Sequence, residues 1–95
     1  MKTTDFLAFD IGASNGRGIV ARFDGERITL HMVGNFENNF ISKGELGHWD
    51  FHHILGEMKA CFQKAKAQGF EPACFGIDTW GVDYGLLDEA GELIE

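Results

Sequence analysis

One amphipathic segment near the middle of the chain limits the possible folds more than any other feature of the sequence. Asp50 precedes it as an N-cap residue, and Trp49 is placed to pack on Ile54 as a hydrophobic staple. Gly69 and then Pro72 mark its end. Its apolar residues recur at helical spacing, at Phe51, Ile54, Leu55, Met58, Phe62 and Ala65. The sequence therefore predicts one helix between Asp50 and Gly69, with short β-prone segments on either side.

Three antiparallel strands are predicted before this helix. Residues 5–10 are almost continuously apolar and end in an acid, which is typical of a strand buried on both faces. Residues 18–23 form a second strand, which turns at residues 24–25 into an alternating third strand at 27–33. Residues 34–47 are irregular and rich in Asn and Gly, so we expect a loop with one short extended piece.

The segments after the helix complete the predicted topology. Residues 73–78 form another short strand that ends in an acid, and residues 82–87 and 92–94 are expected to pair as a trailing hairpin. A helix that leads from antiparallel strands into a further strand is a crossover, so the strand at 73–78 should lie parallel to the first strand, with helical cover on one face. This α/β order matches half of a ribonuclease-H-like, or actin-like ATPase, domain.

Composition excludes several classes of partner. The chain has 8 basic and 15 acidic side chains, and this net charge of −7 disfavours nucleic acid and anionic membrane surfaces. A small anionic nucleotide is still compatible, because backbone N–H groups and a metal ion bind phosphate locally. Cys61 and Cys74 lie in apolar segments and are expected to be buried. Without a secretory signal or a run long enough to span a bilayer, we expect a soluble cytoplasmic protein.

The first candidate site follows the first strand. The strand ends at Asp10, and Gly12 permits close approach of the backbone. Residues 14–16 are expected to form a tight turn whose N–H groups could hold a phosphate. Asp10 is suited to Mg²⁺, and Arg17 to a phosphate oxygen or a neighbouring acid. An ordinary hairpin turn explains the same residues equally well. The loop is neither a Walker A loop nor a dinucleotide fingerprint, because no Gly-Lys-Ser or Gly-Lys-Thr follows and the next element is a strand.

The second candidate site follows the strand at 73–78. Asp78, Trp80 and Gly81 combine a carboxylate, a large aromatic ring and open backbone, a mixture suited to stacking and hydrogen-bonding a sugar. Taken singly, Asp78 is more simply a turn acid and Trp80 a core aromatic.

Together the motifs resemble the N-terminal portion of the FGGY carbohydrate kinases. The resemblance covers essentially the whole chain and is carried by FDIGASNGRG at residues 9–18, GHWDF at 47–51 and GIDTWGVDYGLLDEAGELI at 76–94. It implies an actin-like ATPase fold, with ATP and Mg²⁺ as cofactors. It also implies transfer of the γ-phosphoryl group to the C1 hydroxyl of a ketose such as L-rhamnulose.

The resemblance also assigns roles to individual residues. It implies that Asp10 is the metal-associated acid and that Gly81 contacts the sugar, with Asp78, Trp80 and Asp83 as its neighbours in the substrate site. The implied ATP loop consists of Ala13, Ser14, Asn15, Gly16 and Arg17. In this family the catalytic base and the adenine pocket belong to later segments. The chain, residues 1–95, is therefore expected to be an incomplete part of the kinase's N-terminal domain, inactive without the remainder.

Two other classes of function remain open on the sequence. A non-catalytic actin-like or sugar-sensing module would keep the phosphate loop without the transfer reaction, and an acidic interaction domain would lack a nucleotide site. A histidine metal site is disfavoured, because His52 and His53 are adjacent and point in different directions on a helix, with His48 before them. Met32 and Met58 are expected to serve in packing.

Overall fold

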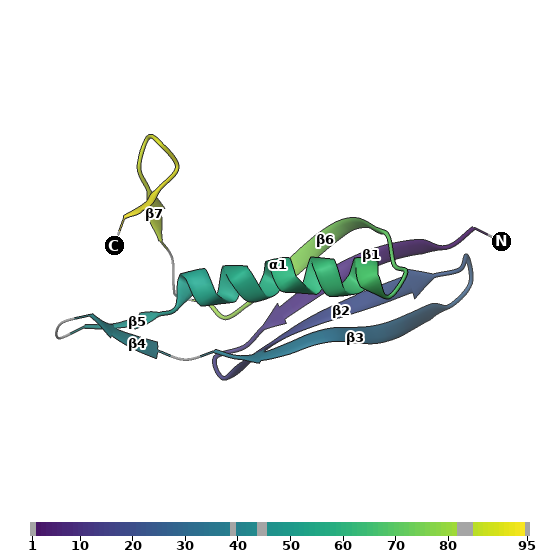
Figure 1. Ribbon diagram of the computed structural model, residues 1–95, viewed down its shortest axis with the longest axis horizontal. Helices are drawn as coiled ribbons and strands as arrows, with labels where there is room; N and C mark the ends of the chain where they lie inside the picture. Colours follow the sequence, from purple (N-terminus) through teal and green to yellow (C-terminus); the bar gives the residue numbers. More distant parts are fainter. Residues whose placement is uncertain (1, 39, 44–45, 82–84, 95) are drawn as a thin grey trace.

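The computed structural model describes residues 2–38, 40–43, 46–81 and 85–94. The elements in chain order are β1 (Thr4–Ile11), β2 (Asn15–Phe23), β3 (Ile28–Glu37), β4 (Phe40–Lys43), β5 (Leu46–Trp49), α1 (Phe51–Ala67), β6 (Pro72–Asp78), β7 (Leu86–Leu87) and β8 (Leu93–Ile94). Strands β1, β2, β3 and β6 form one sheet, and β4–β5 and β7–β8 are separate hairpins (Figure 1).

The topology of the main sheet is the one predicted. The strand order is β3-β2-β1-β6, with β1, β2 and β3 antiparallel and β6 parallel to β1. Helix α1 is the crossover and lies across one face of this sheet (Figure 1). The parallel register sets Asp10 of β1 beside Asp78 of β6, so both acids lie at the same end of the sheet.

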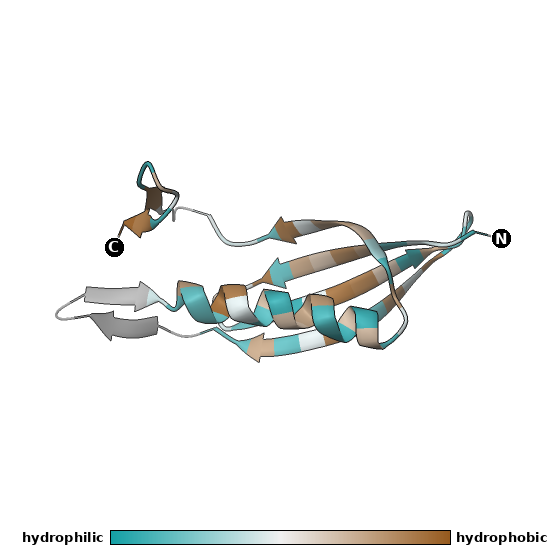
Figure 2. Ribbon diagram, turned by 45° about the horizontal axis from the view of Figure 1, so that its top comes forward, coloured by the Kyte–Doolittle hydropathy of each residue, from teal (hydrophilic) through white to brown (hydrophobic). Residues whose placement is uncertain are grey.

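The core lies between α1 and the sheet. Alternate residues of β1 and the facing residues of the other elements are buried there: Leu7, Phe9, Ile11, Val20, Val33, Phe36, Cys61, Ala65 and Phe70. The helix approaches closely because two glycines face it: a Cβ built on Gly18 or Gly34 would lie 2.6 or 2.4 Å from Sγ of Cys61. The hydrophobic residues of the strands and of this helix face are visible in Figure 2.

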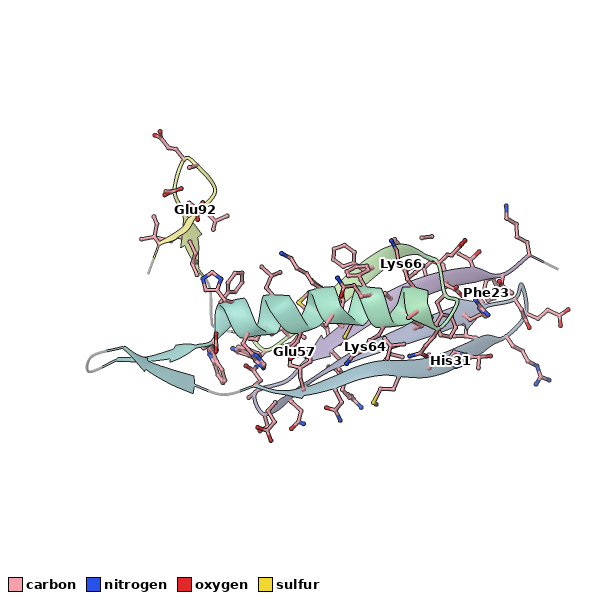
Figure 3. All side chains as sticks on the ribbon, in the orientation of Figure 1. Phe23, His31, Glu57, Lys64, Lys66 and Glu92 are labelled. Carbon is pink, nitrogen blue, oxygen red and sulfur yellow. The ribbon has the colours of Figure 1, made fainter. Side chains whose placement is uncertain are left out.

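Local signals mark the start and the end of α1 as predicted. The side chain of Asp50 accepts a hydrogen bond from the backbone N–H of His53 at 3.1 Å, and Gly69 follows the helix with a φ of 91°. Lys64 and Lys66 lie in the last turn, where positive charge suits the carbonyl end of a helix (Figure 3).

The apolar face of α1 is narrower than predicted. Phe51 and Leu55 are exposed, whereas Ile54, Met58 and Phe62 pack against the core.

The segment expected to be a loop is mostly strand. Strand β3 continues to Glu37 because residues 34–37 pair with residues 15–18 of β2, and residues 40–43 of β4 pair with residues 46–49 of β5. The loop prediction for residues 34–47 was therefore wrong. Of the predicted strand at 82–87, Leu86–Leu87 form β7, and residues 82–84 lie outside the described residues.

The second face of the main sheet remains exposed, contrary to the prediction for the first strand. Five hydrophobic side chains on this face are between 38 and 67% exposed to solvent: Phe6, Phe23, Ile28, Leu30 and Met32. No element in the described part of the chain covers this face, so the predictions that β1 is buried on both sides and that Met32 serves in packing were wrong.

The edge strand β6 is exposed as well. Phe75 and Ile77 are more than half exposed, and Cys74 is exposed, whereas Cys61 is buried as predicted.

An ion-pair network joins the sheet to the end of α1, far from Asp10 and Asp78 along β1. Buried Asp5 accepts two hydrogen bonds from the Arg22 guanidinium, at 2.7 and 2.9 Å, and one from the backbone N–H of Glu71 at 2.9 Å. The same guanidinium lies 4.7 Å from the ring centroid of Phe70, and the ring centroid of His31, labelled in Figure 3, lies 4.9 Å from that of Phe70. These contacts hold the C-terminal end of the crossover against β1 and β2.

Candidate functional site

The loop between β1 and β2 is a tight, closed turn. Ile11 pairs with Gly16, and the N–H of Gly12 donates to the carbonyl of Asn15 at 2.8 Å. Side chains would disturb this geometry, because a Cβ on Gly12 would lie 3.1 Å from the Asn15 oxygen and one on Gly16 would lie 2.2 Å from the Phe36 ring. Gly16 is thus required by its close approach to Phe36, whereas a side chain at position 12 would require a small shift of the turn.

Backbone donors are available on this loop. Ala13, Ser14 and Asn15 are exposed. The backbone N–H groups of Ala13 and Ser14 have no hydrogen-bond acceptor within the described residues. Unpaired N–H groups in a tight turn are the usual feature of a backbone anion site, so the loop can bind an anion.

Asn38, which sequence reasoning missed, ties β3 to this loop. Its Nδ2 donates to the carbonyl of Gly12 at 2.9 Å, and its backbone N–H donates to the carbonyl of Ser14 at 2.9 Å. The residue is only 2% exposed. Its position in an Asn-rich segment gave no signal of this role, because the partners lie 24 to 26 residues away in sequence.

Two carboxyl groups and a guanidinium lie beside the loop at the ends of three adjacent strands. Arg17 of β2 lies opposite Asp10 of β1 and forms an ion pair with it through Nη2 and Oδ2. Of the two roles considered for Arg17, the structure therefore has the pairing with a neighbouring acid.

The pKa values of Asp10 and Asp78 are shifted in opposite directions. Hydrogen bonds from Arg17 and then Asp78 lower the pKa of Asp10, whereas the hydrogen bond shared with Asp10, together with loss of hydration, raises the pKa of Asp78. Carboxylate oxygens of this kind suit Mg²⁺, which keeps several of its waters. The described residues contain no cluster of three or more His, Cys, Asp or Glu side chains able to hold a metal ion, so a cation here would depend on these two acids, water and ligand oxygens.

Trp80 and Gly81 follow β6, at the end of the sheet where Asp10 and Asp78 lie. The Trp80 ring packs against the core and tilts against Trp49 with ring centroids 4.6 Å apart. Gly81 is exposed, and a Cβ built there meets nothing within 4 Å. Asp83 lies outside the described residues.

The histidines near the start of α1 have other contacts. The Nε2 of His53 lies 3.1 Å from the carbonyl of Glu37, and its ring packs edge-on against Phe36. His52 packs against Phe51, and the side chain of His48 lies outside the described residues. In the part of the chain that is described, no helix is long and apolar enough to cross a membrane.

Comparison with known proteins relates this arrangement to sugar kinases. No protein-family model matches the chain. Curated relatives, however, match it over nearly its whole length, and those compared are kinases by name.

These relatives are rhamnulokinases. The chain is 41% identical over 91 residues to the rhamnulokinase of Enterococcus faecalis, which covers 95% of this chain and 18% of that protein. It is 38% identical over 87 residues to the rhamnulokinase of Bacillus subtilis, a match that covers 92% of this chain and 18% of that protein. It is 45% identical over 83 residues to the rhamnulokinase of Halalkalibacterium halodurans, a match that covers 87% of this chain and 18% of that protein. The chain is thus a relative of the rhamnulokinases that spans about a fifth of their length, and the predicted resemblance is confirmed.

Proposed function

We propose that this chain is the N-terminal part of an ATP-dependent FGGY carbohydrate kinase that phosphorylates the C1 hydroxyl of a ketose such as L-rhamnulose. The observation that carries the proposal is the closed loop at residues 12–15, with unpaired N–H groups on Ala13 and Ser14, beside the carboxyl groups of Asp10 and Asp78. The similarity to rhamnulokinases supports the sugar-kinase class. The order β3-β2-β1-β6 with its crossover helix supports half of a ribonuclease-H-like, actin-like domain.

The loop would bind the terminal phosphates of ATP. Backbone N–H groups of Ala13 and Ser14 would donate to phosphate oxygens, with Asn15 and Gly16 closing the turn. Arg17 would hold Asp10 in its ionised form through their ion pair. When bound, Mg²⁺ supplies neutralisation of the charge on the transferred phosphoryl group. Asp10 and Asp78 fit that ion as oxygen ligands that act directly or through water.

The sugar would lie beyond the end of β6. Gly81 leaves open space where a ring could approach the backbone, and Trp80 and Asp83 flank it in sequence. Because the Trp80 ring packs on Trp49, one side of it is already occupied. We therefore assign Trp80 to the wall of the sugar site.

Phosphoryl transfer requires more than this chain carries. Catalysis of this type depends on positioning and charge neutralisation by all parts together. The catalytic base and the adenine pocket are assigned to the remainder of the kinase, which is the chain's principal partner alongside ATP and the sugar. We expect residues 1–95 alone to be inactive and the complete enzyme to be cytoplasmic.

The test is Asp10→Ala in the complete protein, with Asp88→Ala as the control, because Asp88 belongs to the exposed turn between β7 and β8. We expect kcat to fall by about 100-fold or more in Asp10→Ala, since a metal-positioning acid acts on the transition state, while the melting temperature stays near that of the parent. Equal kinetics in Asp10→Ala and the parent would refute the metal role. ATP binding without any sugar phosphorylation by the parent would indicate a non-catalytic actin-like or sugar-sensing module instead.

A further inference from the structure

Asn38 makes two hydrogen bonds that fix the peptide groups of the loop. Its side chain donates to the carbonyl of Gly12 and its backbone N–H to the carbonyl of Ser14, both at 2.9 Å. In a planar trans peptide, the carbonyl and the following N–H point in opposite directions. Drawing these two carbonyls toward Asn38 therefore turns the N–H groups of Ala13 and Asn15 away from it, and the N–H of Ala13 is one of the two loop donors without an acceptor among the described residues.

The burial of Asn38 is unusual for a residue with only a packing role. It is 2% exposed, and its Oδ1 has no hydrogen-bond partner within the described part of the chain. Almost all buried polar side-chain atoms are paired, so an unpaired buried acceptor needs a reason. An apolar residue of similar size would avoid the unpaired oxygen, but it could not donate to Gly12.

We infer that Asn38 is a positioning residue for phosphate binding, which orients the N–H of Ala13 by holding the carbonyl of Gly12 with its side chain while its backbone holds that of Ser14. The ligand class is the terminal phosphates of a nucleotide, and to that extent the inference rests on the proposed function. Asn38 does not touch the phosphate, because it lies on the side of the loop opposite the turned N–H groups. Its effect should thus appear in nucleotide binding and not in sugar binding.

The chain offers a matched pair of variants. Asn38→Asp keeps the size of the side chain but replaces the donor to Gly12 with an acceptor. Asn35→Asp makes the same chemical change at an exposed position of β3, three residues before Asn38, and retains an oxygen that can accept from Asn15 Nδ2. If Asn38→Asp does not fold, Asn38→Ala serves instead, because it removes the side-chain donor to Gly12 and keeps the backbone bond to Ser14.

Both variants are compared with the parent in the complete protein, by ATP and sugar kinetics and by hydrogen exchange of peptides covering residues 9–17. For Asn38→Asp we expect the KM for ATP to rise about tenfold, as for loss of a well-placed hydrogen-bonding group, with the KM for sugar within about twofold of the parent. The amide of Gly12, which donates to the carbonyl of Asn15, should exchange faster, while those of α1 are unchanged. Asn35→Asp should alter neither measurement.

Two results would overturn the inference: an unchanged KM for ATP, or equal rises in the KM values for ATP and sugar. Hydrogen exchange separates this inference from the proposed function. If the parent binds no ATP, the proposed function fails, whereas unchanged loop exchange in Asn38→Asp would refute the positioning role whether or not ATP binds.

Discussion

The contact between Cys61 of α1 and Gly34 of β3 gives a quantitative test of how the helix is seated on the sheet. In Gly34→Ala, the new Cβ would lie 2.4 Å from Sγ of Cys61, about 1 Å closer than the 3.4 Å at which ordinary contact begins. Both groups lie between two rigid elements, so the clash cannot be relieved by rotation of a long side chain. Overpacking a core in this way costs about 1–3 kcal/mol, and we expect a loss of about 2 kcal/mol in the free energy of unfolding.

A double-mutant cycle assigns that loss to the contact. Cys61→Ala alone should cost about 1 kcal/mol, because it removes a buried sulfur. In the double variant, the Gly34→Ala methyl group would face only the Cβ of residue 61, at the ordinary distance of 3.9 Å. The double variant should therefore be about as stable as Cys61→Ala, with a coupling energy of about 2 kcal/mol.

Urea unfolding followed by circular dichroism measures these differences. Gly76→Ala on the edge strand β6 is the matched control, because a Cβ there meets nothing within 4 Å, and its stability should stay within about 0.5 kcal/mol of the parent. A stable Gly34→Ala, or a double variant whose losses simply add, would refute the seating of α1 on the glycine pair.

Two further predictions address the substrate site and the ion-pair network. Gly81→Val should raise the KM for the sugar about tenfold in the complete protein with little change in the KM for ATP, because side-chain bulk would enter open space; an unchanged sugar KM would remove Gly81 from the site. Asp5→Asn should lower the free energy of unfolding by about 2 kcal/mol at neutral pH. Hydrogen bonds from Arg22 lower the pKa of Asp5 below its ordinary 3.8, so its stabilisation is present above that value and lost as the pH falls through the lowered pKa. Urea titrations at pH 7 and in the acid range should therefore converge for parent and variant at low pH, and a constant difference would contradict this assignment.

Local signals predicted α1 and the order of the main sheet. The Asp50 cap, Gly69 and helical periodicity act within a few residues, so they could be recognised in the sequence. The end of β3 could not, because residues 34–37 become strand only by pairing with residues 15–18. Apolar periodicity also could not tell whether a second layer covers a strand, and for this reason the exposure of Phe6 and Phe75 was missed.

The sequence suggested which residues could form the candidate site, but it could not predict the contacts between them. Asp10 and the loop follow directly from a strand that ends in an acid before a glycine-rich turn. The pairing of Asp10 with Arg17 depends on the strand register, and the juxtaposition with Asp78 depends on parallel pairing across a helix. Asn38 could not be found at all, since its role consists of hydrogen bonds to the backbone of a distant segment.

The central claim is that the loop after β1 receives the phosphates of Mg-ATP. The most direct measurement is the change in amide NMR shifts on addition of Mg-ATP to the complete protein, with the amides of Ala13 and Ser14 assigned by selective labelling. Large shifts at these two amides, abolished by Asp10→Ala and retained in Asp88→Ala, are the expected result. Saturable binding of Mg-ATP that leaves both amides unmoved would contradict the claim.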